Sequence, residues 1–547
     1  MAFQRLIQAI TFGLFLFLLY LAAYPLVSAL SVELFLTMDP VVFAGTLISA
    51  RTVVAALLPA VLILGLTFVM GRFFCSYICP MGTTIDITDR LVCSGERGKI
   101  RTSPEWLPLL RIVKYLVLFF ILGSALMGIS LVFLASPLSL ITRLYGLVIF
   151  PVFELLGDIG LNIIRGAGDL LGITIFPYAS IHVPRYDLQW LIVGSFIIIF
   201  GCAVFSPRFW CRYICPAGAL FALCAKRPLL RRVVDEKCIR CGLCQSECPM
   251  GAIPEDPLET TYSECIACLK CVKVCPVDAV GFMYSGKESV NNGYGFSKDR
   301  RKLIYAGIFG AATALISMTG LRRLNNTGDP GQIVPPSLIR PPGAVPEADF
   351  LARCIRCGEC MKVCPTNTLQ PIGLVAGFTA LASPVITPQI GPCEPLCNIC
   401  GQVCPTGAIR ALSASEKIWA RVGTAYIVKH KCLAWEFDRE CLICDEVCPF
   451  DAISLKRVEG LNVAVPFVDE DRCNGCGFCE YYCPVISQKA IVVEPMNALR
   501  MESGSYRDAA QEQGFSFEIK QPSADDRRDQ DDSLPGFEDS LPPGFTE

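Results

Sequence analysis

Apolar residues gather in five long runs within the first 320 residues, whereas the remainder of the chain mixes short apolar segments with turns. The runs contain no Asp, Glu, Lys or Arg, and they cover residues 6–30, 52–70, 115–135, 188–205 and 303–320. Each approaches the roughly 20 apolar residues with which a helix crosses a bilayer. The pattern predicts five transmembrane helices; the alternative is that they are core helices of a soluble domain.

Lys and Arg are unevenly distributed between these runs. Segments 72–114 and 208–237 hold seven each, segment 136–186 holds three, and segment 31–50 holds none. Because loops rich in Lys and Arg stay in the cytoplasm, we expect the N-terminus and the residues after the fourth helix to be cytoplasmic. Segment 144–172 mixes apolar and charged residues, so we expect surface helices there on the outer side.

The apolar half contains an internal repeat with two cysteines in each copy. Residues 70–82 read MGRFFCSYICPMG and residues 206–218 read SPRFWCRYICPAG, each after a predicted pair of helices. Two related halves could bring Cys75, Cys79, Cys211 and Cys215 together. Four thiolates are the ligand set of one iron–sulfur cluster, so we hypothesise a shared redox site, either an additional cluster or a dithiol pair. The alternative is free thiols in structural turns.

Composition supports several domains rather than one large core. The chain has 547 residues, 53% of them hydrophobic, with 38 prolines and 44 glycines. This combination is typical of membrane helices joined to loop-rich soluble modules. The formal net charge of −2 gives no reason to expect a nucleic-acid partner.

Cysteine usage is the most informative part of the composition. There are 31 Cys against 2 His, and 24 of the cysteines form six groups of four. Groups this tight do not resemble a disulfide scaffold. Their spacing is that of ligands to [4Fe–4S] clusters, so we expect six such clusters.

Residues 238–275 contain two consecutive C-x2-C-x2-C-x3-C-P motifs. In this two-cluster ferredoxin pattern the fourth cysteine of each motif binds the other cluster. One predicted ligand set is Cys238, Cys241, Cys244 and Cys275, and the other is Cys265, Cys268, Cys271 and Cys248. Structural zinc, the alternative, prefers two separated C-x2-C pairs.

A second cysteine-rich region follows the fifth apolar run. Arg300 and Arg301 precede that run as in a twin-arginine export signal; the alternative is an ordinary stop-transfer helix with positive flanks. Residues 321–349 are rich in proline and predict an extended linker. Four motifs then follow at Cys354, Cys357, Cys360, Cys364; Cys393, Cys397, Cys400, Cys404; Cys432, Cys441, Cys444, Cys448; and Cys473, Cys476, Cys479, Cys483.

The C-terminal segment 501–547 is acidic, with 12 Asp and Glu against 4 Lys and Arg. This composition predicts a disordered tail. The expected fold is therefore multidomain: an α-helical membrane domain of four helices plus a fifth crossing, with small α+β ferredoxin-like modules on both sides. The expected domains are 1–230 (membrane), 231–285 (cytoplasmic two-cluster ferredoxin), 297–320 (fifth helix), 321–349 (linker), 350–500 (periplasmic four-cluster module) and 501–547 (tail).

These motifs resemble two known families. Residues 1–285 resemble the NapH-type membrane ferredoxins, which are quinol dehydrogenase subunits. Residues 297–495, with the phrases RPPGAVPEADFLARCIRCGECMKVCPTNTLQP and CEPLCNICGQVCPTGAI, resemble the NapG/MauM-type exported ferredoxins. The chain is thus similar to a fusion of the two. The resemblance implies oxidation of membrane quinol, delivery of electrons to a periplasmic reductase or c-type cytochrome, and a place in the bacterial inner membrane.

The resemblance also implies how the four outer motifs share their ligands. In relatives with four clusters the first motif pairs with the fourth and the second with the third. The implied ligand sets are Cys354, Cys357, Cys360, Cys483; Cys473, Cys476, Cys479, Cys364; Cys393, Cys397, Cys400, Cys448; and Cys432, Cys441, Cys444, Cys404.

Other redox chemistry has little support in the sequence. No C-x-x-C-H motif occurs, and His182 and His430 are the only histidines, so we expect no haem. His182 precedes the fourth apolar run, where it could accept a proton from quinol or simply form a structural hydrogen bond. Two other functions remain open: a conduit from a cytoplasmic donor across the membrane, and a redox protein for maturation or regulation of another respiratory enzyme.

Overall fold

The computed structural model describes residues 2–24, 26, 33–92, 107–170, 181–284, 303–316, 338–486 and 488–516. The chain forms two compact units. Unit 1 takes in Met1–Ala22, Leu30–Thr327 and Leu351–Glu359, and unit 2 takes in Ala23–Ala29, Gly328–Phe350 and Cys360–Glu547. The twin arginines and residues 321–337 of the expected linker lie outside the described residues.

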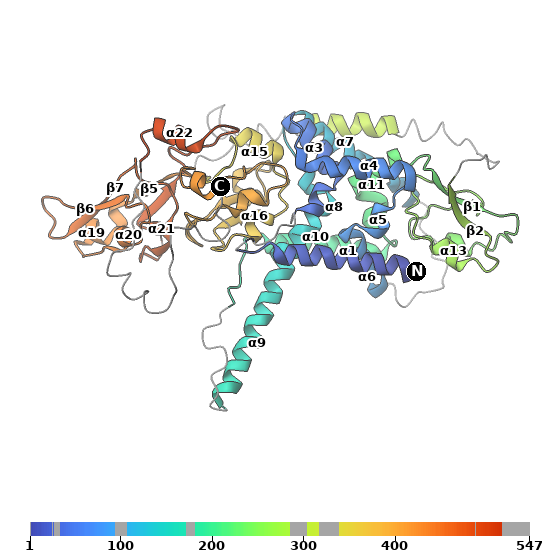
Figure 1. The fold of residues 1–547 in the computed structure, drawn as a ribbon, viewed down its shortest axis with the longest axis horizontal. Helices are drawn as coiled ribbons and strands as arrows, with labels where there is room; N and C mark the ends of the chain where they lie inside the picture. Colours follow the sequence, from blue (N-terminus) through green and yellow to red (C-terminus); the bar gives the residue numbers. More distant parts are fainter. Residues whose placement is uncertain are drawn as a thin grey trace, which may run out of the picture. The chain divides into compact units, whose positions relative to one another are not determined.

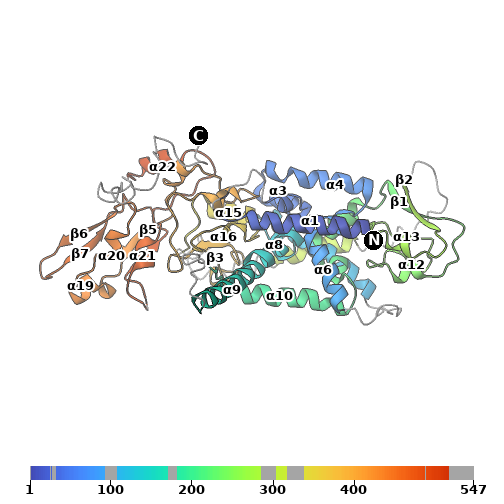
Figure 2. The same ribbon diagram turned by 60° about the horizontal axis from the view of Figure 1, so that its bottom comes forward.

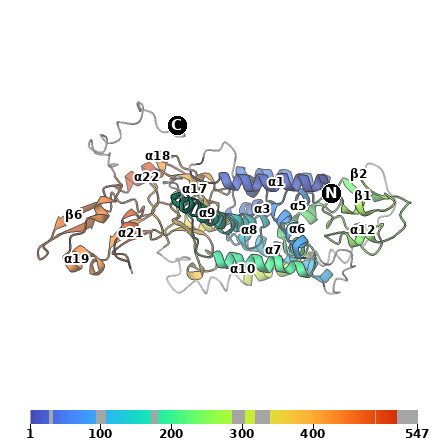
Figure 3. The same ribbon diagram turned by 90° about the horizontal axis from the view of Figure 1, so that it is seen from below.

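Most of unit 1 is helical (Figure 1). Figure 3 shows α1 and α10 on opposite sides of this helical part, and Figures 2 and 3 show the strands β1 and β2 at one end of it. Its helical elements are α1 (Ala2–Leu21), α2 (Leu34–Thr37), α3 (Pro40–Ala50), η1 (Ala55–Leu57), α4 (Leu58–Met70), α5 (Phe74–Tyr77), α6 (Pro80–Val92), η3 (Leu107–Ile112), α7 (Val113–Leu126), η4 (Val132–Leu134), α8 (Pro137–Leu144), η5 (Tyr145–Ile149), α9 (Phe150–Leu170), α10 (Gln189–Gly201), η6 (Cys202–Val204), η7 (Trp210–Ile214) and α11 (Pro216–Cys224).

Each of the five apolar runs contains a helix. Among the described residues, only Gln4–Leu21 and Pro137–Gly166 are long and apolar enough to cross a membrane. Shorter apolar helices occupy Pro40–Ala50, Ala55–Met70, Gln189–Val204 and Leu303–Ile316. In the third run α7 stops at Leu126 because the chain turns at Gly128, whose φ of 79° is readily adopted only by glycine.

Residues 144–172, which were expected to form surface helices, overlap the longer candidate span, Pro137–Gly166. The helices α8 and α9 follow each other through the π-helical turn η5, and α9 extends away from the rest of unit 1 (Figure 1). Apolar side chains of α9, including Phe153 and Ile163, are exposed. By length and composition this stretch is a candidate span as well as a surface helix.

Four helices of unit 1 begin at a proline, namely α3, α6, α8 and α11. Proline suits the first helical position because its missing N–H would have no partner there. Asp39 caps α3 by accepting the Val41 N–H at 2.9 Å, and its other oxygen accepts the Ser136 hydroxyl at 2.6 Å. Since Ser136 caps α8, this hydrogen bond joins the starts of two helices from different halves of the repeat.

Residues 230–284 form a small two-stranded module within unit 1. The strands β1 (Leu230–Val234) and β2 (Val280–Tyr284) pair antiparallel, with Leu230 opposite Tyr284. Between them lie two short helices, α12 (Leu243–Ser246) and α13 (Lys270–Val274), each within one cysteine motif. This is the α+β arrangement predicted from the motif pair.

The fifth apolar helix, Leu303–Ile316, packs against α7 through small residues. A methyl group added at Gly310 would lie 2.8 Å from Phe119 Cβ and 3.0 Å from the Leu116 carbonyl oxygen. One added at Gly123 would lie 3.0 Å from Ala314 Cβ. Glycine and alanine on both helices therefore allow this close approach.

Unit 2 consists of short helices and three two-stranded antiparallel sheets, β3–β4, β5–β8 and β6–β7. The helix α15 (Glu347–Arg353) crosses the boundary between the units. The other elements are α16 (Glu359–Lys362), β3 (Leu369–Pro371), η8 (Leu374–Ala376), β4 (Pro384–Ile386), α17 (Ile399–Gln402), α18 (Ala414–Lys417), β5 (Thr424–Ile427), η9 (Lys429–Lys431), α19 (Leu433–Phe437), α20 (Ile443–Glu446), β6 (Ile453–Arg457), β7 (Ala464–Val468), α21 (Phe478–Tyr482), β8 (Ile491–Glu494) and α22 (Tyr506–Glu512).

Two expected boundaries need correction. The tail was expected to be disordered from residue 501, but Tyr506 and Phe515 are fully buried in a cluster with Leu412 and Leu499. Apolar side chains in an acidic segment thus suffice to fold 501–516 onto unit 2. The expected linker is also packed where it is described, since Arg340 is buried and paired with Glu347.

Candidate iron–sulfur sites

Four cavities in the protein are each lined by four cysteines. Their volumes are similar, about 370, 390, 380 and 310 Å³ including space open to solvent. Apart from the cysteines they are lined mainly by apolar side chains. The cysteine sets are Cys364, Cys393, Cys397, Cys400; Cys432, Cys441, Cys444, Cys483; Cys248, Cys265, Cys268, Cys271; and Cys448, Cys473, Cys476, Cys479.

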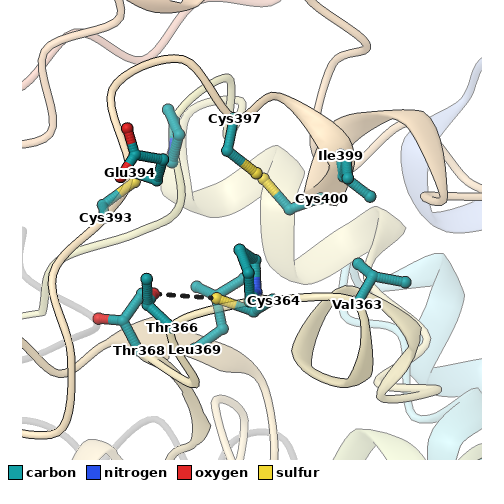
Figure 4. Close-up of a pocket in the computed structure, with 12 residues that line it drawn as sticks. Val363, Cys364, Thr366, Thr368, Leu369, Cys393, Glu394, Cys397, Ile399 and Cys400 are labelled. Atoms are coloured by element: carbon teal, nitrogen blue, oxygen red, sulfur yellow. Dashed lines mark hydrogen bonds between the residues drawn. The ribbon is translucent and has the colours of Figure 1, made fainter. Parts of the chain in front are cut away.

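The first of these cavities lies within unit 2 (Figure 4). Cys397 and Cys400 line one side of it, and Cys364 lies across from them on a different segment. Lys417 is buried and donates hydrogen bonds to the carbonyl oxygens of Glu394, at 2.5 Å, and Pro395. Its ammonium also interacts with the Cys393 thiol. A buried cation at a thiolate site lowers the cost of the extra negative charge there.

The outer cavities combine the cysteines differently from the sets that the resemblance implied. Cys364 lies with the second motif, where Cys448 was expected, and Cys483 lies with the third motif, where Cys404 was expected. Cys448 in turn lies with the fourth motif. The third and fourth motifs therefore exchange their fourth cysteines, as in a two-cluster ferredoxin, and the second motif is joined by the fourth cysteine of the first.

The module at 230–284 follows the same rule, and here the expected grouping agrees with the cavity. Cys248 of its first motif lies with Cys265, Cys268 and Cys271 of its second. Sulfur atoms at the fourth position of each motif accept backbone N–H groups, from Ala252 to Cys248 and from Ala279 to Cys275, both at 3.3 Å. Such N–H···S contacts favour thiolate ligands and tune the potential of a bound cluster.

The cysteines of the described residues are all free thiols, without disulfide bonds. Within the same residues no three His, Cys, Asp or Glu side chains are grouped closely enough to hold a single metal ion. Thiolates at the corners of a cubane stand further apart than ligands of one ion. Three cysteines of one motif with a fourth from another segment, as for Cys393, Cys397, Cys400 and Cys364, are the ligand arrangement of ferredoxin-type [4Fe–4S] clusters, whereas structural zinc prefers two separated C-x2-C pairs.

A buried ion-pair network fastens the module 230–284 to the helical part of unit 1. Glu264 accepts Lys114 Nζ at 2.5 Å and Arg72 Nη1 at 3.0 Å, and both cationic side chains are 0% exposed. Burial raises the pKa of the Glu264 carboxyl, but Lys114 and Arg72 lower it by more, so it lies below its ordinary value. Arg72 also donates to the Ser263 carbonyl, which extends the network to the backbone beside Cys265.

A second set of contacts reaches the same cysteine loop. The Tyr77 hydroxyl donates to the Ala267 carbonyl oxygen at 3.0 Å, between Cys265 and Cys268. Arg208 donates two hydrogen bonds to Asp86, at 2.7 and 2.6 Å. Burial raises the pKa of Asp86, but Arg208 outweighs this and holds it at about 2. Neither Glu264 nor Asp86 was predicted from the sequence. Their only signal there is position, since Glu264 directly precedes Cys265 and Asp86 closely follows the first copy of the repeat.

Unit 1 also contains residues 351–359, which carry two cysteines of the first outer motif. The Ser139 hydroxyl donates to the Ile355 carbonyl at 2.8 Å, and Arg143 Nε donates to the Arg356 carbonyl at 3.0 Å. Arg356 is buried, donates to the Ser130 carbonyl at 3.0 Å and stacks on Phe133. This cysteine loop is therefore held by α8 and by the turn before η4.

The four cysteines of the repeat and the two histidines do not line these four cavities. Cys79, Cys211 and Cys215 are buried and Cys75 is partly buried, all four near the cysteine turns of the repeat. His182 is exposed in the irregular segment before α10. His430 lies in η9 of unit 2.

Family models match most of the cysteine motifs. A model described as a 4Fe-4S binding domain matches residues 52–99, 188–234 and 399–421. Models described as 4Fe-4S dicluster domains match 231–276 and 439–487, and a further 4Fe-4S binding domain matches 351–370. The match at 439–487 covers most of the third motif and all of the fourth, which agrees with the exchange between those motifs.

Several curated proteins are similar to parts of the chain. The methylamine utilization ferredoxin-type protein MauM of Methylorubrum extorquens is 35% identical over 36% of this chain and 90% of its own length. The ferredoxin-type protein NapG of Escherichia coli is 36% identical over 31% of this chain and 75% of its own length. A putative electron transport protein of Escherichia coli, YccM, is 31% identical over 41% of this chain and 54% of its own length. The chain therefore belongs to the ferredoxin-type proteins that include MauM and NapG, and it is an iron–sulfur electron-transfer protein with several [4Fe–4S] domains.

Proposed function

We propose that this protein oxidises quinol in the bacterial inner membrane and delivers the electrons to a periplasmic reductase or c-type cytochrome. The observation that supports this most is the buried network of Arg72, Lys114 and Glu264, which fixes a two-cluster module against the apolar helices. A module held rigidly at that position can exchange electrons with a donor in the bilayer. Oxidation of one quinol releases two electrons and two protons, so it requires one-electron acceptors nearby.

Six [4Fe–4S] clusters supply that chemistry, since each accepts and releases one electron. We assign four of them to the cysteine sets of the four cavities. The motif spacing assigns a fifth to Cys238, Cys241, Cys244 and Cys275. The exchange of fourth cysteines between consecutive motifs, applied to the sequence, leaves Cys354, Cys357, Cys360 and Cys404 for the sixth.

The proposal includes a membrane domain of four helices plus a fifth crossing at 303–320, the module 231–285 in the cytoplasm and the module 350–500 in the periplasm. The charge pattern of the loops supports this topology. A natural fusion of NapH-type and NapG/MauM-type proteins would have this organisation. His182 is a candidate proton acceptor for quinol because it is exposed and close to the predicted membrane surface.

The direct test is reduction of the clusters by quinol. Purified membranes containing the full chain are mixed anaerobically with a reduced short-chain quinone, and the loss of the visible absorbance of oxidised clusters is followed. We expect reduction by quinol, and we expect reoxidation by periplasmic extract. Membranes in which dithionite but not quinol reduces the clusters would rule out quinol as the donor.

A second candidate function is a conduit from a cytoplasmic donor to the periplasm. The same two predicted cluster sites of 230–284 favour it, because a module in the cytoplasm could also accept electrons from a soluble donor. In that case a reduced cytoplasmic ferredoxin, rather than quinol, would reduce the membrane-bound protein. Support of the maturation of another respiratory enzyme is the third candidate, which deletion of the gene and assay of other oxidases and reductases would test.

A further inference from the structure

The two cysteine turns of the repeat have the same local structure. Cys79 and Cys215 each precede a helix that starts at a proline, α6 and α11 respectively. The Cys215 sulfur accepts the Gly218 N–H at 3.3 Å, and the Cys79 sulfur likewise accepts a backbone hydrogen bond from Gly82. Helix starts favour negative charge. Both turns therefore present a sulfur in a position that suits a thiolate.

The two turns also lie beside each other rather than at opposite ends of unit 1. Arg208 of the second copy donates to the Cys75 carbonyl of the first at 3.1 Å. Arg72 of the first copy approaches the second so closely that a methyl group on Gly218 would lie 2.7 Å from its Nη2 atom. The rings of Phe74 and Phe221 are 5.6 Å apart. An arginine of each copy therefore packs against the cysteine turn of the other copy.

The four thiols are close enough to influence one another. Burial raises the pKa of Cys79, and Cys75 and Cys211 raise it further. Burial also raises the pKa of Cys215, with added effects of Cys211, Cys75 and Cys79.

The buried guanidinium of Arg72 is an independent observation that favours an anionic group between the two cysteine turns. Its side chain is 0% exposed, and it interacts electrostatically with Cys75 of its own copy and Cys215 of the other. Among the described residues, its Nε and Nη2 atoms have no hydrogen-bond partner. Buried donors of a guanidinium are costly to leave unsatisfied, whereas an iron–sulfur cluster with four thiolates is an anion that would accept them.

We propose that Cys75, Cys79, Cys211 and Cys215 together hold a seventh iron–sulfur cluster, in addition to the six ferredoxin-type clusters. The ligand set is complete, because four cysteine thiolates hold one such cluster. Arg72 and Arg208 offset its charge and orient the two turns. The match of one 4Fe-4S binding domain model to both copies, at 52–99 and 188–234, supports the same ligand chemistry.

The position of this site gives it a role within the proposed function. Tyr77 lies between Cys75 and Cys79 in the sequence and contacts the loop that carries Cys265 and Cys268. Arg208 interacts electrostatically with both Cys211 and Cys268. The site would transfer one electron at a time from quinol, the reductant, to the oxidised cluster of that loop. This role depends on the proposed function, but the presence of the cluster does not.

The test is the metal content of the full-length protein purified anaerobically. Six [4Fe–4S] clusters account for about 24 iron atoms per chain, so the proposal expects more than this, with a matching excess of acid-labile sulfide. The double variant Cys79→Ser, Cys215→Ser should lose only that excess. The matched control is Cys202→Ser, Cys224→Ser, because these cysteines lie in the same half but outside the group, and it should lose nothing.

Each outcome is decisive. Equal iron and sulfide contents in the wild type and the Cys79, Cys215 variant would overturn the cluster. Two reducible disulfides in the wild type would then indicate that the four cysteines form redox-active dithiol pairs instead. If the variant does not accumulate, the wild-type count decides: sulfide for six clusters overturns the proposal, and sulfide for more supports it. Quinol-driven reduction is measured separately, so failure of the proposed function leaves this result intact.

Discussion

At the scale of single residues, the outer sites are distinguished by the charged groups beside their cysteines. Lys417 is the clearest case, because its side chain is only 5% exposed and contacts the segment around Cys393. A bound cluster becomes more negative on reduction, so a neighbouring cation makes reduction easier. The composition of a motif does not reveal such a group, since Lys417 lies outside all six motifs.

Replacing Lys417 by methionine should lower the reduction potential of the cluster held by Cys364, Cys393, Cys397 and Cys400. Loss of one charge at ~10 Å is worth about 1–2 kcal/mol at an effective dielectric constant of ~20, which corresponds to about 40–80 mV for a one-electron couple. Redox titration followed by electron paramagnetic resonance measures this. Lys456→Met, on exposed β6, is the control and should leave all potentials unchanged.

The exchange of fourth cysteines can be tested with single serine substitutions. Cys364→Ser should alter the same cluster signal as Cys393→Ser, because both residues line one cavity. Cys448→Ser should instead alter the signal that Cys473→Ser alters. Matching changes for Cys448→Ser and Cys393→Ser in paramagnetic resonance spectra would restore the grouping implied by the resemblance.

At the scale of secondary-structure elements, two features were not predicted from the sequence: the close packing of Leu303–Ile316 on α7 and the short helix α22. The helix Leu303–Ile316 approaches α7 at Gly310, where no side chain fits. The helix α22 brings Tyr506 and Ala510 into the apolar cluster of unit 2. Neither contact follows from the apolar or acidic character of its segment.

Gly310→Ala should destabilise the packing of Leu303–Ile316 on α7. The new methyl group meets Phe119 Cβ at 2.8 Å and backbone atoms at 3.0 and 3.1 Å, so the helices must move apart. Overpacking of this kind costs about 1–3 kcal/mol. Gly307→Ala is the matched control, since its nearest contact would be 3.9 Å. Thermal unfolding in detergent should show a lower midpoint for Gly310→Ala only.

Truncation should separate the folded part of the acidic segment from the rest. A chain that ends after residue 504 lacks the buried Tyr506, Ala510 and Phe515 and should be less stable, since removing one buried aromatic side chain alone costs about 3–5 kcal/mol. A chain that ends after residue 516 keeps these contacts and should unfold like the full chain. Equal proteolysis rates for both truncated chains would show that α22 adds no stability.

At the scale of the whole molecule, cysteine motifs of one type occur in both units and on both sides of the fifth apolar helix. Within unit 1 the helical part holds a cysteine loop at two places, Cys265–Cys268 through Tyr77 and Glu264, and Cys354–Cys357 through Ser139 and Arg143. Such an arrangement suits transfer of electrons along a chain of sites, provided that the fifth helix crosses the membrane.

Reporter fusions test that crossing. Fusions at Ser285 and after Gly328 should give opposite signals, cytoplasmic for the first and periplasmic for the second, because the Lys- and Arg-rich loops keep their side of the membrane. Replacing Arg300 and Arg301 by lysine should block export of the second reporter if the twin-arginine route is used. Two cytoplasmic signals would mean that 303–320 does not span.

The sequence by itself determined the chemistry of this protein. Twenty-four of the 31 cysteines stand in six regular groups of four, which specify iron–sulfur ligands because ligand spacing is a local property of the chain. The α+β module at 230–284 was predictable for the same reason. The folded segment 501–516 was not, because burial of Tyr506 and Phe515 depends on a partner surface far away in the sequence.

Among the four motifs between Cys354 and Cys483, tertiary structure decided which cysteines line a common cavity. Cys364 and Cys393 are separated by a long segment, and only the folding of consecutive motifs into one unit brings them to the same cavity. The rule of exchange between neighbouring motifs was visible in 238–275, but the resemblance to other four-cluster proteins pointed elsewhere. The approach of Arg72 to Gly218 and of Arg208 to Cys75 was likewise decided in three dimensions, since a repeat predicts similar halves but does not fix how they pack.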